Sequence, residues 1–136
     1  MLDLAARWQK DTLDLKPDLL SILIGVNDEG KGVALDVYEQ TYDRLLADTL
    51  AANPRVRFVL GEPFGTRTAL SARRAIVARL AEKYKAALVP FQAAFDKACE
   101  RAPLDHWIWD GVHPTYSGHQ IMADCWEDAV RRQWPG

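Results

Sequence analysis

The chain has 136 residues, of which 49% are hydrophobic and 26% are charged, and its formal net charge is -2. This length and composition are typical of one globular domain, so we expect residues 1–136 to form a single domain. The small net charge argues against a nucleic-acid partner, and no apolar run reaches the roughly eighteen residues that a transmembrane segment needs.

The first third of the chain predicts a helix, a strand and a second helix. Apolar residues at helical spacing predict a helix over residues 2–15, which Pro17 ends because proline disfavours helical geometry in its predecessor. Residues 19–25 are almost continuously apolar, which is typical of a strand that is covered on both faces in a parallel sheet. A glycine-containing loop at 29–33 then leads to a helical stripe over 35–52.

The same alternation continues to the end of the chain. Buried strands are expected at 56–61 and 87–91, and Pro90 indicates either an edge strand or the strand's last residue. Helices are expected from residue 71 with Ser71 as the cap, over 92–101, and from 115 onward. This order indicates an α/β fold with a parallel sheet of about three strands, right-handed crossovers and about five helices on its two faces.

The stretch Asp110-Gly-Val-His113-Pro114 carries the clearest chemical signal. An acid close before a histidine can form the orienting half of a hydrolytic triad, in which the carboxylate fixes the tautomer of the imidazole. The imidazole then takes a proton from a nucleophile. Because Pro114 disfavours helical backbone at His113, we expect the histidine on an extended loop with its ring free to project.

A second candidate site residue follows the first predicted strand. Gly25-Val-Asn27-Asp28 stands at the carboxyl end of strand 19–25, where open α/β sheets bind their ligands. We therefore expect Asn27 to contact a substrate, although an asparagine there can also cap a turn. Asp28 is expected to be a structural acid that bonds backbone groups.

Together these two stretches resemble the SGNH (GDSL-type) hydrolase family, in its lysophospholipase-like esterase branch. Ile24-Gly-Val-Asn-Asp28 resembles the family's Gly-x-Asn-Asp block, and Asp110-Gly-Val-His113 resembles its Asp-x-x-His block. The resemblance implies a flavodoxin-like three-layer α/β/α fold and a serine ester hydrolase of the esterase, lipase or acylhydrolase type. It implies no metal and no organic cofactor, and a small-molecule, lipid or sugar ester as the substrate.

The resemblance also implies roles for individual residues. His113 would be the catalytic base, Asp110 its orienter, and Asn27 a donor to the oxyanion. Apart from the resemblance, Trp107 and Trp109, which lead into the Asp110 loop, are expected to lie in the core or to form a wall of the substrate pocket.

The family's Gly-Asp-Ser block, whose serine is the nucleophile, does not occur in the sequence, and neither does its second, glycine-containing block. The chain thus resembles the carboxyl-terminal two-thirds of the family domain, and we expect these residues alone to be inactive. The three serines have structural interpretations. Ser21 lies in a predicted buried strand, Ser71 caps a helix, and Ser117 begins the last helix, from which it could approach His113.

The resemblance implies that the Gly-Asp-Ser strand would pair beside residues 19–25, so its absence leaves an edge of strand 19–25 unpaired. A long unpaired strand edge recruits another chain, so we expect a homo-oligomer or pairing through the edge of strand 19–25. A non-catalytic α/β interaction module remains an alternative function for such a chain.

A metal-dependent hydrolase is the other alternative, although its candidate ligands match no zinc spacing: Asp105, His106, Asp110, His113 and His119. Cys99 and Cys125 also lack metal-type spacing and fall on predicted helices. We expect both to be free and buried, and the protein to be cytoplasmic.

Overall fold

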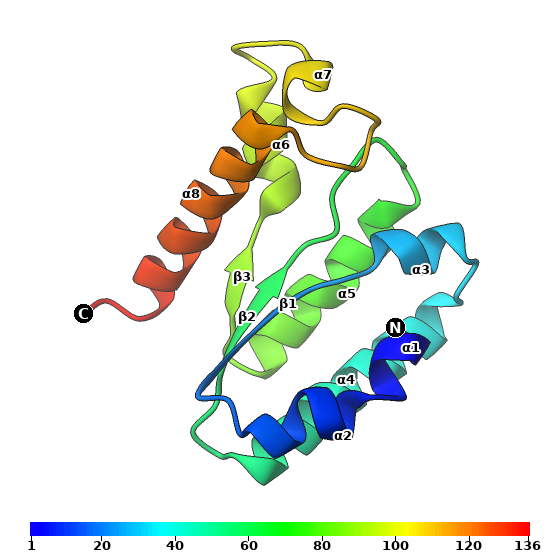
Figure 1. Cartoon of the computed structure of the whole chain (residues 1–136), viewed down its shortest axis with the longest axis vertical. Coiled ribbons are helices and arrows are strands. Elements are labelled where there is room, and N and C mark those ends of the chain that lie inside the picture. The colour runs from blue at the N-terminus through cyan, green and yellow to red at the C-terminus, as the bar shows by residue number, and fades with distance from the viewer.

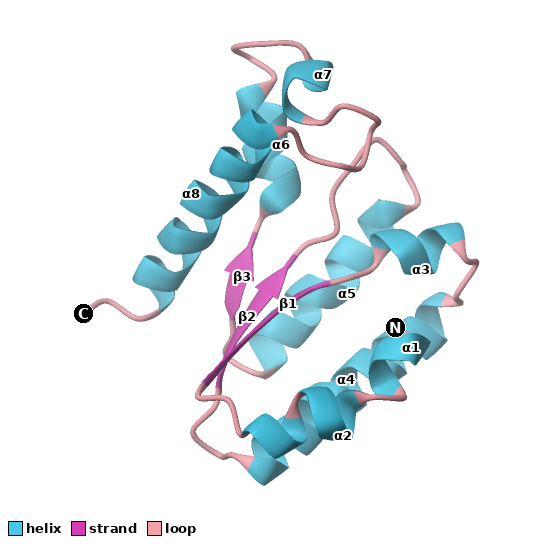
Figure 2. Ribbon diagram, in the orientation of Figure 1, coloured by secondary structure: helices cyan, strands magenta, loops and turns pink.

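The computed structural model describes residues 1–136 as a three-stranded parallel sheet with helices on both faces (Figures 1 and 2). The strands β1 (Leu19–Leu23), β2 (Arg57–Gly61) and β3 (Ala87–Val89) lie in the order β1-β2-β3. Their register aligns Ser21 with Val59 and Val59 with Ala87. The predicted α/β class and its three parallel strands are confirmed, and β1 and β3 are the two edges of the sheet.

Two pairs of helices form the outer layers. Helices α4 (Leu35–Ala52) and α5 (Leu70–Lys83) cover one face, and α6 (Phe91–Ala98) and α8 (Tyr116–Gln133) cover the other (Figure 2). The sheet has a hydrophobic core on each face, because successive side chains of a strand point to opposite faces. In β2, Phe58 and Leu60 join the cluster with α4 and α5, whereas Val59 between them joins the cluster with α6 and α8. None of these helices is long and apolar enough to cross a membrane.

The prediction of one helix over residues 2–15 is wrong. This segment forms α1 (Leu2–Ala5), α2 (Trp8–Asp11) and the 3-10 turn η1 (Leu13–Leu15). The break falls at Arg7, whose N–H bonds the carbonyl of Leu4 at 3.2 Å in a tighter turn. Beyond the break the Trp8 indole is buried and donates to Thr49 Oγ1 on α4 at 3.1 Å. Burying this large side chain against α4 stabilises the fold more than one continuous helix over residues 2–15 would.

Two further short helices were not expected from the sequence. Residues Val26–Gly30, which include Asn27, form helix α3 where a turn and loop were predicted. Helix α7 (Leu104–Trp107) lies between α6 and the Asp110 loop. A single helical turn presents too few residues for a periodic pattern, so sequence periodicity did not reveal either.

Three burial or capping predictions are also wrong. Strand β1 is not covered on both faces, because Leu19 and Leu23 are 41% and 44% exposed at the sheet's edge. Ser71 lies inside α5, where its hydroxyl donates to the carbonyl of Thr68 at 2.9 Å instead of capping the helix. The cysteines are free as expected, but Cys99 is exposed and Cys125 is half-buried.

Candidate active site

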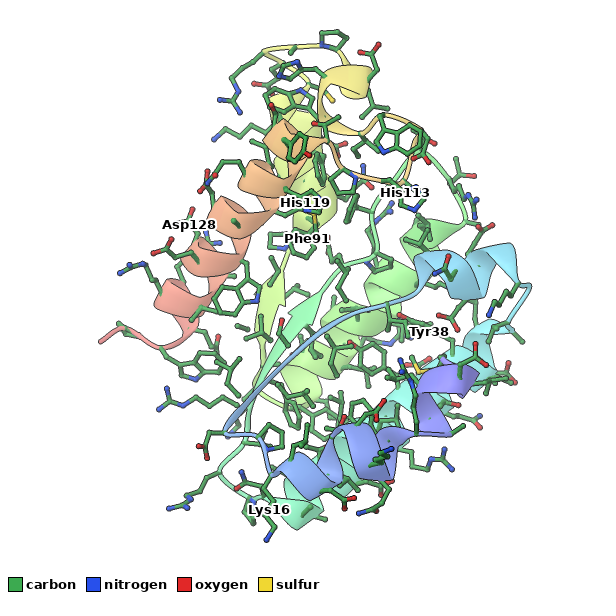
Figure 3. All side chains as sticks on the ribbon, viewed as in Figure 1. Lys16, Tyr38, Phe91, His113, His119 and Asp128 are labelled. Atoms are coloured by element: carbon green, nitrogen blue, oxygen red, sulfur yellow. The ribbon has the colours of Figure 1, made fainter.

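A cavity of about 340 Å³ lies at the end of the molecule where the strands have their carboxyl ends. His113 is found there, above helix α3 (Figure 3). The cavity is lined by residues of three segments: Leu23, Ile24, Gly25, Val26, Asn27, Phe64, Arg67, Val112 and His113. The two motifs that are far apart in the sequence therefore share one cavity, and each contributes the polar side chain that the sequence singled out.

Asp110 and His113 form a tightly bonded pair. His113 Nδ1 lies 2.6 Å from Asp110 Oδ2, while Asp110 Oδ1 accepts the backbone N–H groups of His113 at 2.8 Å and Val112 at 3.1 Å. The hydrogen bond from the His113 ring, together with these backbone donors, lowers the pKa of Asp110 to about 2. An ionised carboxylate on Nδ1 leaves His113 Nε2 as the nitrogen that can accept a proton.

The loop that carries this pair is pinned at its base. Ile108 and Pro114 form an antiparallel bridge, and the N–H of Trp109 bonds the carbonyl of His113 at 3.1 Å. Helix α8 begins directly behind the loop, and Thr115 Oγ1 caps it by accepting from Gly118 at 3.1 Å. A Cβ at Gly118 would lie 2.0 Å from the carbonyl oxygen of Trp107, so only glycine permits this close approach.

Asn27 is placed by the turn between β1 and α3. Gly25 has a φ of +131°, a conformation that favours glycine, and an added Cβ would lie 3.0 Å from Tyr38 Oη. The Tyr38 hydroxyl donates to the carbonyl of Ile24 at 3.0 Å and so fixes the end of β1. Asp28 is buried and pairs with the amino group of Met1, whereas Asn27 is exposed and its amide bonds no other residue. The Asn27 amide is therefore free to donate to a ligand.

The two tryptophans differ in their positions. Trp107 is buried in the core, and its indole donates to the carbonyl of Ala102 at 3.1 Å. Neither Trp107 nor Trp109 is among the residues that line the cavity. Trp109 is 66% exposed, and its ring stacks beside that of His113, with centroids 6.0 Å apart and planes at 28°. Of the two, only Trp109 lies where a bound molecule could reach it.

No serine lines the cavity. Ser21 is exposed rather than buried, and its hydroxyl accepts the Trp126 indole N–H at 3.0 Å instead of bonding backbone. Ser71 lies in α5, and Ser117 lies in the first turn of α8. The structure thus brings together the Asp110–His113 pair and the Asn27 amide without a serine beside them.

The sequence interpretation missed two residues of the cavity wall, Phe64 and Arg67. Both lie on the loop that follows β2. Their position at a strand's carboxyl end was a usable signal, but a single arginine in a loop is not distinguished by its residue type. The loop also contacts the His113 segment directly, because the N–H of Thr66 bonds the carbonyl of Gly111 at 3.0 Å.

The structure gives no support to the metal-dependent alternative. Nowhere in the chain do three or more histidine, cysteine, aspartate or glutamate side chains gather as metal ligands would. His106 packs edge-on against Trp107, with ring centroids 4.5 Å apart, and His119 lines a separate cavity beside Phe91 and Trp126.

Comparison with known proteins gives one consistent result. Residues 1–121 match the family described as GDSL-like lipase/acylhydrolase. An acetylxylan esterase from Geobacillus stearothermophilus is 32% identical in an alignment of 151 positions, which covers 97% of this chain and 68% of the esterase. The chain thus spans about two-thirds of the length of this relative.

Solved structures agree with this match. A protein from Parabacteroides merdae described as a GDSL-like lipase superimposes with a TM-score of 0.88 at 35% identity, over 95% of this chain and 67% of that one. The structure of the Geobacillus stearothermophilus acetylxylan esterase gives a TM-score of 0.82 at 33% identity, over 97% and 66%. Structures of that esterase include two catalytic mutants, in which a serine and a histidine are each replaced by alanine.

Proposed function

The chain belongs to the GDSL-like lipase/acylhydrolase family, and from this premise we propose that Asp110, His113 and Asn27 form most of a serine ester hydrolase site. One observation carries the proposal. His113 and Asn27 line a single cavity. Asp110 Oδ2 lies 2.6 Å from His113 Nδ1, which leaves Nε2 as the nitrogen that can accept a proton. Neither the metal-dependent nor the non-catalytic alternative has comparable support.

The proposed reaction is acyl transfer through a serine. A serine hydroxyl attacks the ester carbonyl while His113 Nε2 accepts its proton, and the Asp110 carboxylate stabilises the imidazolium that forms. The Asn27 amide donates to the oxyanion of the tetrahedral intermediate. His113 then protonates the leaving alcohol, and a water molecule activated by the same histidine releases the acid. Since no serine of residues 1–136 lines the cavity, we propose that the attacking serine lies outside these residues.

The proposed substrate is the ester of a short acyl group with a carbohydrate. The support is the likeness to an acetylxylan esterase. In this proposal Trp109 forms the outer wall of the substrate site beside His113, and the buried Trp107 only supports the loop from below.

Substituting Asn27 by alanine tests the oxyanion role. The experiment uses a joined protein, in which the segment of the Geobacillus esterase that precedes the matched region is fused ahead of this chain to supply a serine. Loss of one oxyanion donor is expected to lower kcat on p-nitrophenyl acetate by about a hundred- to a thousandfold. Asn53→Ala is the control, because that asparagine binds the carbonyl of Pro17 away from the cavity. A kcat within threefold of the parent protein would show that Asn27 does not stabilise the oxyanion.

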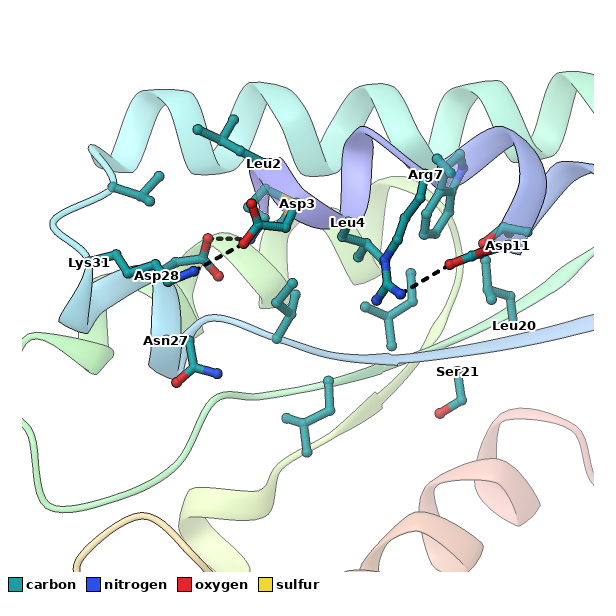
Figure 4. A pocket seen from close by; sticks show the side chains of 17 residues that line it. Leu2, Asp3, Leu4, Arg7, Asp11, Leu20, Ser21, Asn27, Asp28 and Lys31 are labelled. Carbon is teal, nitrogen blue, oxygen red and sulfur yellow. Dashed lines mark hydrogen bonds and ion pairs between the residues drawn. The ribbon is translucent and has the colours of Figure 1, made fainter.

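We also propose that the chain associates through the free edge of β1. This strand pairs only with β2, and a groove of about 680 Å³ runs along its other side against α1 and α2 (Figure 4). One oxygen of buried Asp28, Oδ2, lies in the wall of the groove without a hydrogen-bond partner. An added strand would supply backbone donors to this edge and cover Leu19 and Leu23.

Association through β1 predicts a defined effect of charge at the edge. Light scattering should show wild-type assemblies larger than a monomer, and Leu19→Lys should shift the population toward monomer because lysine opposes edge pairing. Leu15→Lys is the matched control, since Leu15 is also exposed but lies outside the strand. A monodisperse wild-type monomer at high protein concentration would contradict the proposal.

A further inference from the structure

Arg67 is the only arginine, lysine, aspartate or glutamate in the wall of the cavity, and the proposed mechanism does not use it. It stands on the loop between β2 and α5, and it lines the cavity together with Asn27 and His113. The Arg67 side chain is 46% exposed, so it faces both the cavity and solvent. This position suits a group that contacts the part of a substrate projecting out of the catalytic centre.

The guanidinium is held in place before any ligand arrives. Arg67 Nη1 donates to Glu29 Oε2 on α3 at 2.7 Å, and it lies directly over Gly30, where an added Cβ would be 3.0 Å away. The preceding residue, Thr66, is tied to the Gly111 carbonyl of the His113 loop. Arg67 therefore bridges the helix that carries Asn27 and the loop that contacts the base, and little side-chain freedom remains to be lost on binding.

We propose that Arg67 is a specificity residue that binds the alcohol portion of the ester through neighbouring hydroxyl groups; this inference rests on the proposed ester hydrolase function. Only one of the five N–H donors of the guanidinium is engaged by Glu29. The remaining donors lie in a planar fork, which suits two adjacent oxygen atoms. Glu29 beside it supplies acceptor oxygens for hydroxyl protons.

The pairing with Glu29 also decides between ligand classes. Because the carboxylate neutralises the guanidinium, an anionic ligand gains little net attraction at this position. A long aliphatic acyl chain would cover both charged groups without replacing their hydrogen bonds to water, which is unfavourable. A neutral polyol both donates and accepts, so it satisfies the pair. Arg67 is therefore expected to select carbohydrate esters over long-chain acyl esters.

An NMR titration of the 136-residue chain with xylobiose tests this role without any turnover. The side-chain N–H signals of Arg67 and of the Trp109 indole should shift on binding, and Arg67→Met should weaken binding at least tenfold. Arg67→Lys should weaken it at least fivefold, because lysine keeps the charge but not the fork. The matched control is Arg79→Met, since Arg79 forms a similar exposed pair with Glu39 outside the cavity. This control should bind within twofold of the wild type.

Three results of the xylobiose titration would overturn the inference. These are the absence of xylobiose binding to the wild type, binding by Arg67→Met within twofold of the wild type, and full rescue by lysine. Arg67-dependent binding of octanoate in place of xylobiose would equally overturn it, in favour of an anion site. The titration does not depend on catalysis, so an inactive joined protein would count against the hydrolase proposal alone. Conversely, an Arg67 variant that binds normally leaves that proposal standing.

Discussion

Residues 1–136 alone are expected to hydrolyse p-nitrophenyl acetate no faster than buffer does. His113 and Asn27 line the cavity, and Asp110 bonds His113 from behind it, but none of the three serines of the chain lines it. In serine hydrolases, loss of the nucleophile alone removes about a millionfold of turnover. The two polar motifs can then bind and polarise an ester, but they cannot form the acyl intermediate. A spectrophotometric assay of the purified chain measures this directly.

The contrary result has a clear signature. Turnover well above buffer that His113→Ala abolishes would mean that a hydroxyl of this chain serves as the nucleophile. Ser117 would then be tested first, since it lies in the first turn of α8, four residues after His113. Ser71→Ala is the matched control, because that hydroxyl is bonded to the Thr68 carbonyl in α5.

Asp110→Asn is expected to lower kcat of the joined protein by about ten-thousandfold. An asparagine amide at this position can donate to His113 Nδ1, which then favours the tautomer with its proton on Nε2 and removes the acceptor that the serine needs. The backbone bonds from Val112 and His113 can still form to the amide oxygen, so the loop should keep its shape. Steady-state kinetics, with circular dichroism to confirm folding, would check this expectation.

The control for this variant is Asp105→Asn, since Asp105 is an exposed acid on α7 that pairs with no residue of the cavity. A loss of less than tenfold in Asp110→Asn would show that the His113 ring is oriented by other contacts, such as its stacking on Trp109.

The acidity of Asp110 fixes how the pair responds to pH. Its pKa falls from the usual 3.8 to about 2, chiefly because the His113 ring bonds the ionised carboxylate. A folded-state pKa below the unfolded one means that the contribution of this group to stability is present above about pH 4 and is lost as the pH falls toward 2. Asp110 should therefore stay ionised throughout the neutral range, and no step of the activity profile between pH 5 and 8 should arise from this carboxylate.

The Asp110–His113 hydrogen bond could be predicted from the sequence because it is local. Asp110 and His113 stand three positions apart, and Pro114 keeps the histidine out of a helix, so spacing alone brings the two side chains together. Asn27 could be predicted because parallel strands present their carboxyl ends at one edge of the sheet. The order of strands and major helices could also be predicted from hydrophobic periodicity. Each such pattern depends only on the residues of its own element.

The errors arose where the outcome depends on partners distant in the sequence. The apolar run at Leu19–Leu23 indicates a strand but not which neighbours cover it, and its exposed leucines show that one side is free. The helix at residues 2–15 is broken because Trp8 is anchored on α4. Trp107 ends α7 facing the core, while Trp109 follows the change to extended backbone at Ile108 and faces outward. Arg67 reaches the cavity through a loop whose path no sequence pattern reports.

The central claim is that His113, held by Asp110 and facing Asn27 across one cavity, is the base of an ester hydrolase whose serine lies outside these residues. The most direct measurement is the rate of p-nitrophenyl acetate hydrolysis by the joined protein, with histidine and with alanine at position 113. The account predicts turnover with His113 and none above buffer with His113→Ala. Equal rates in the two proteins, both folded, would contradict it.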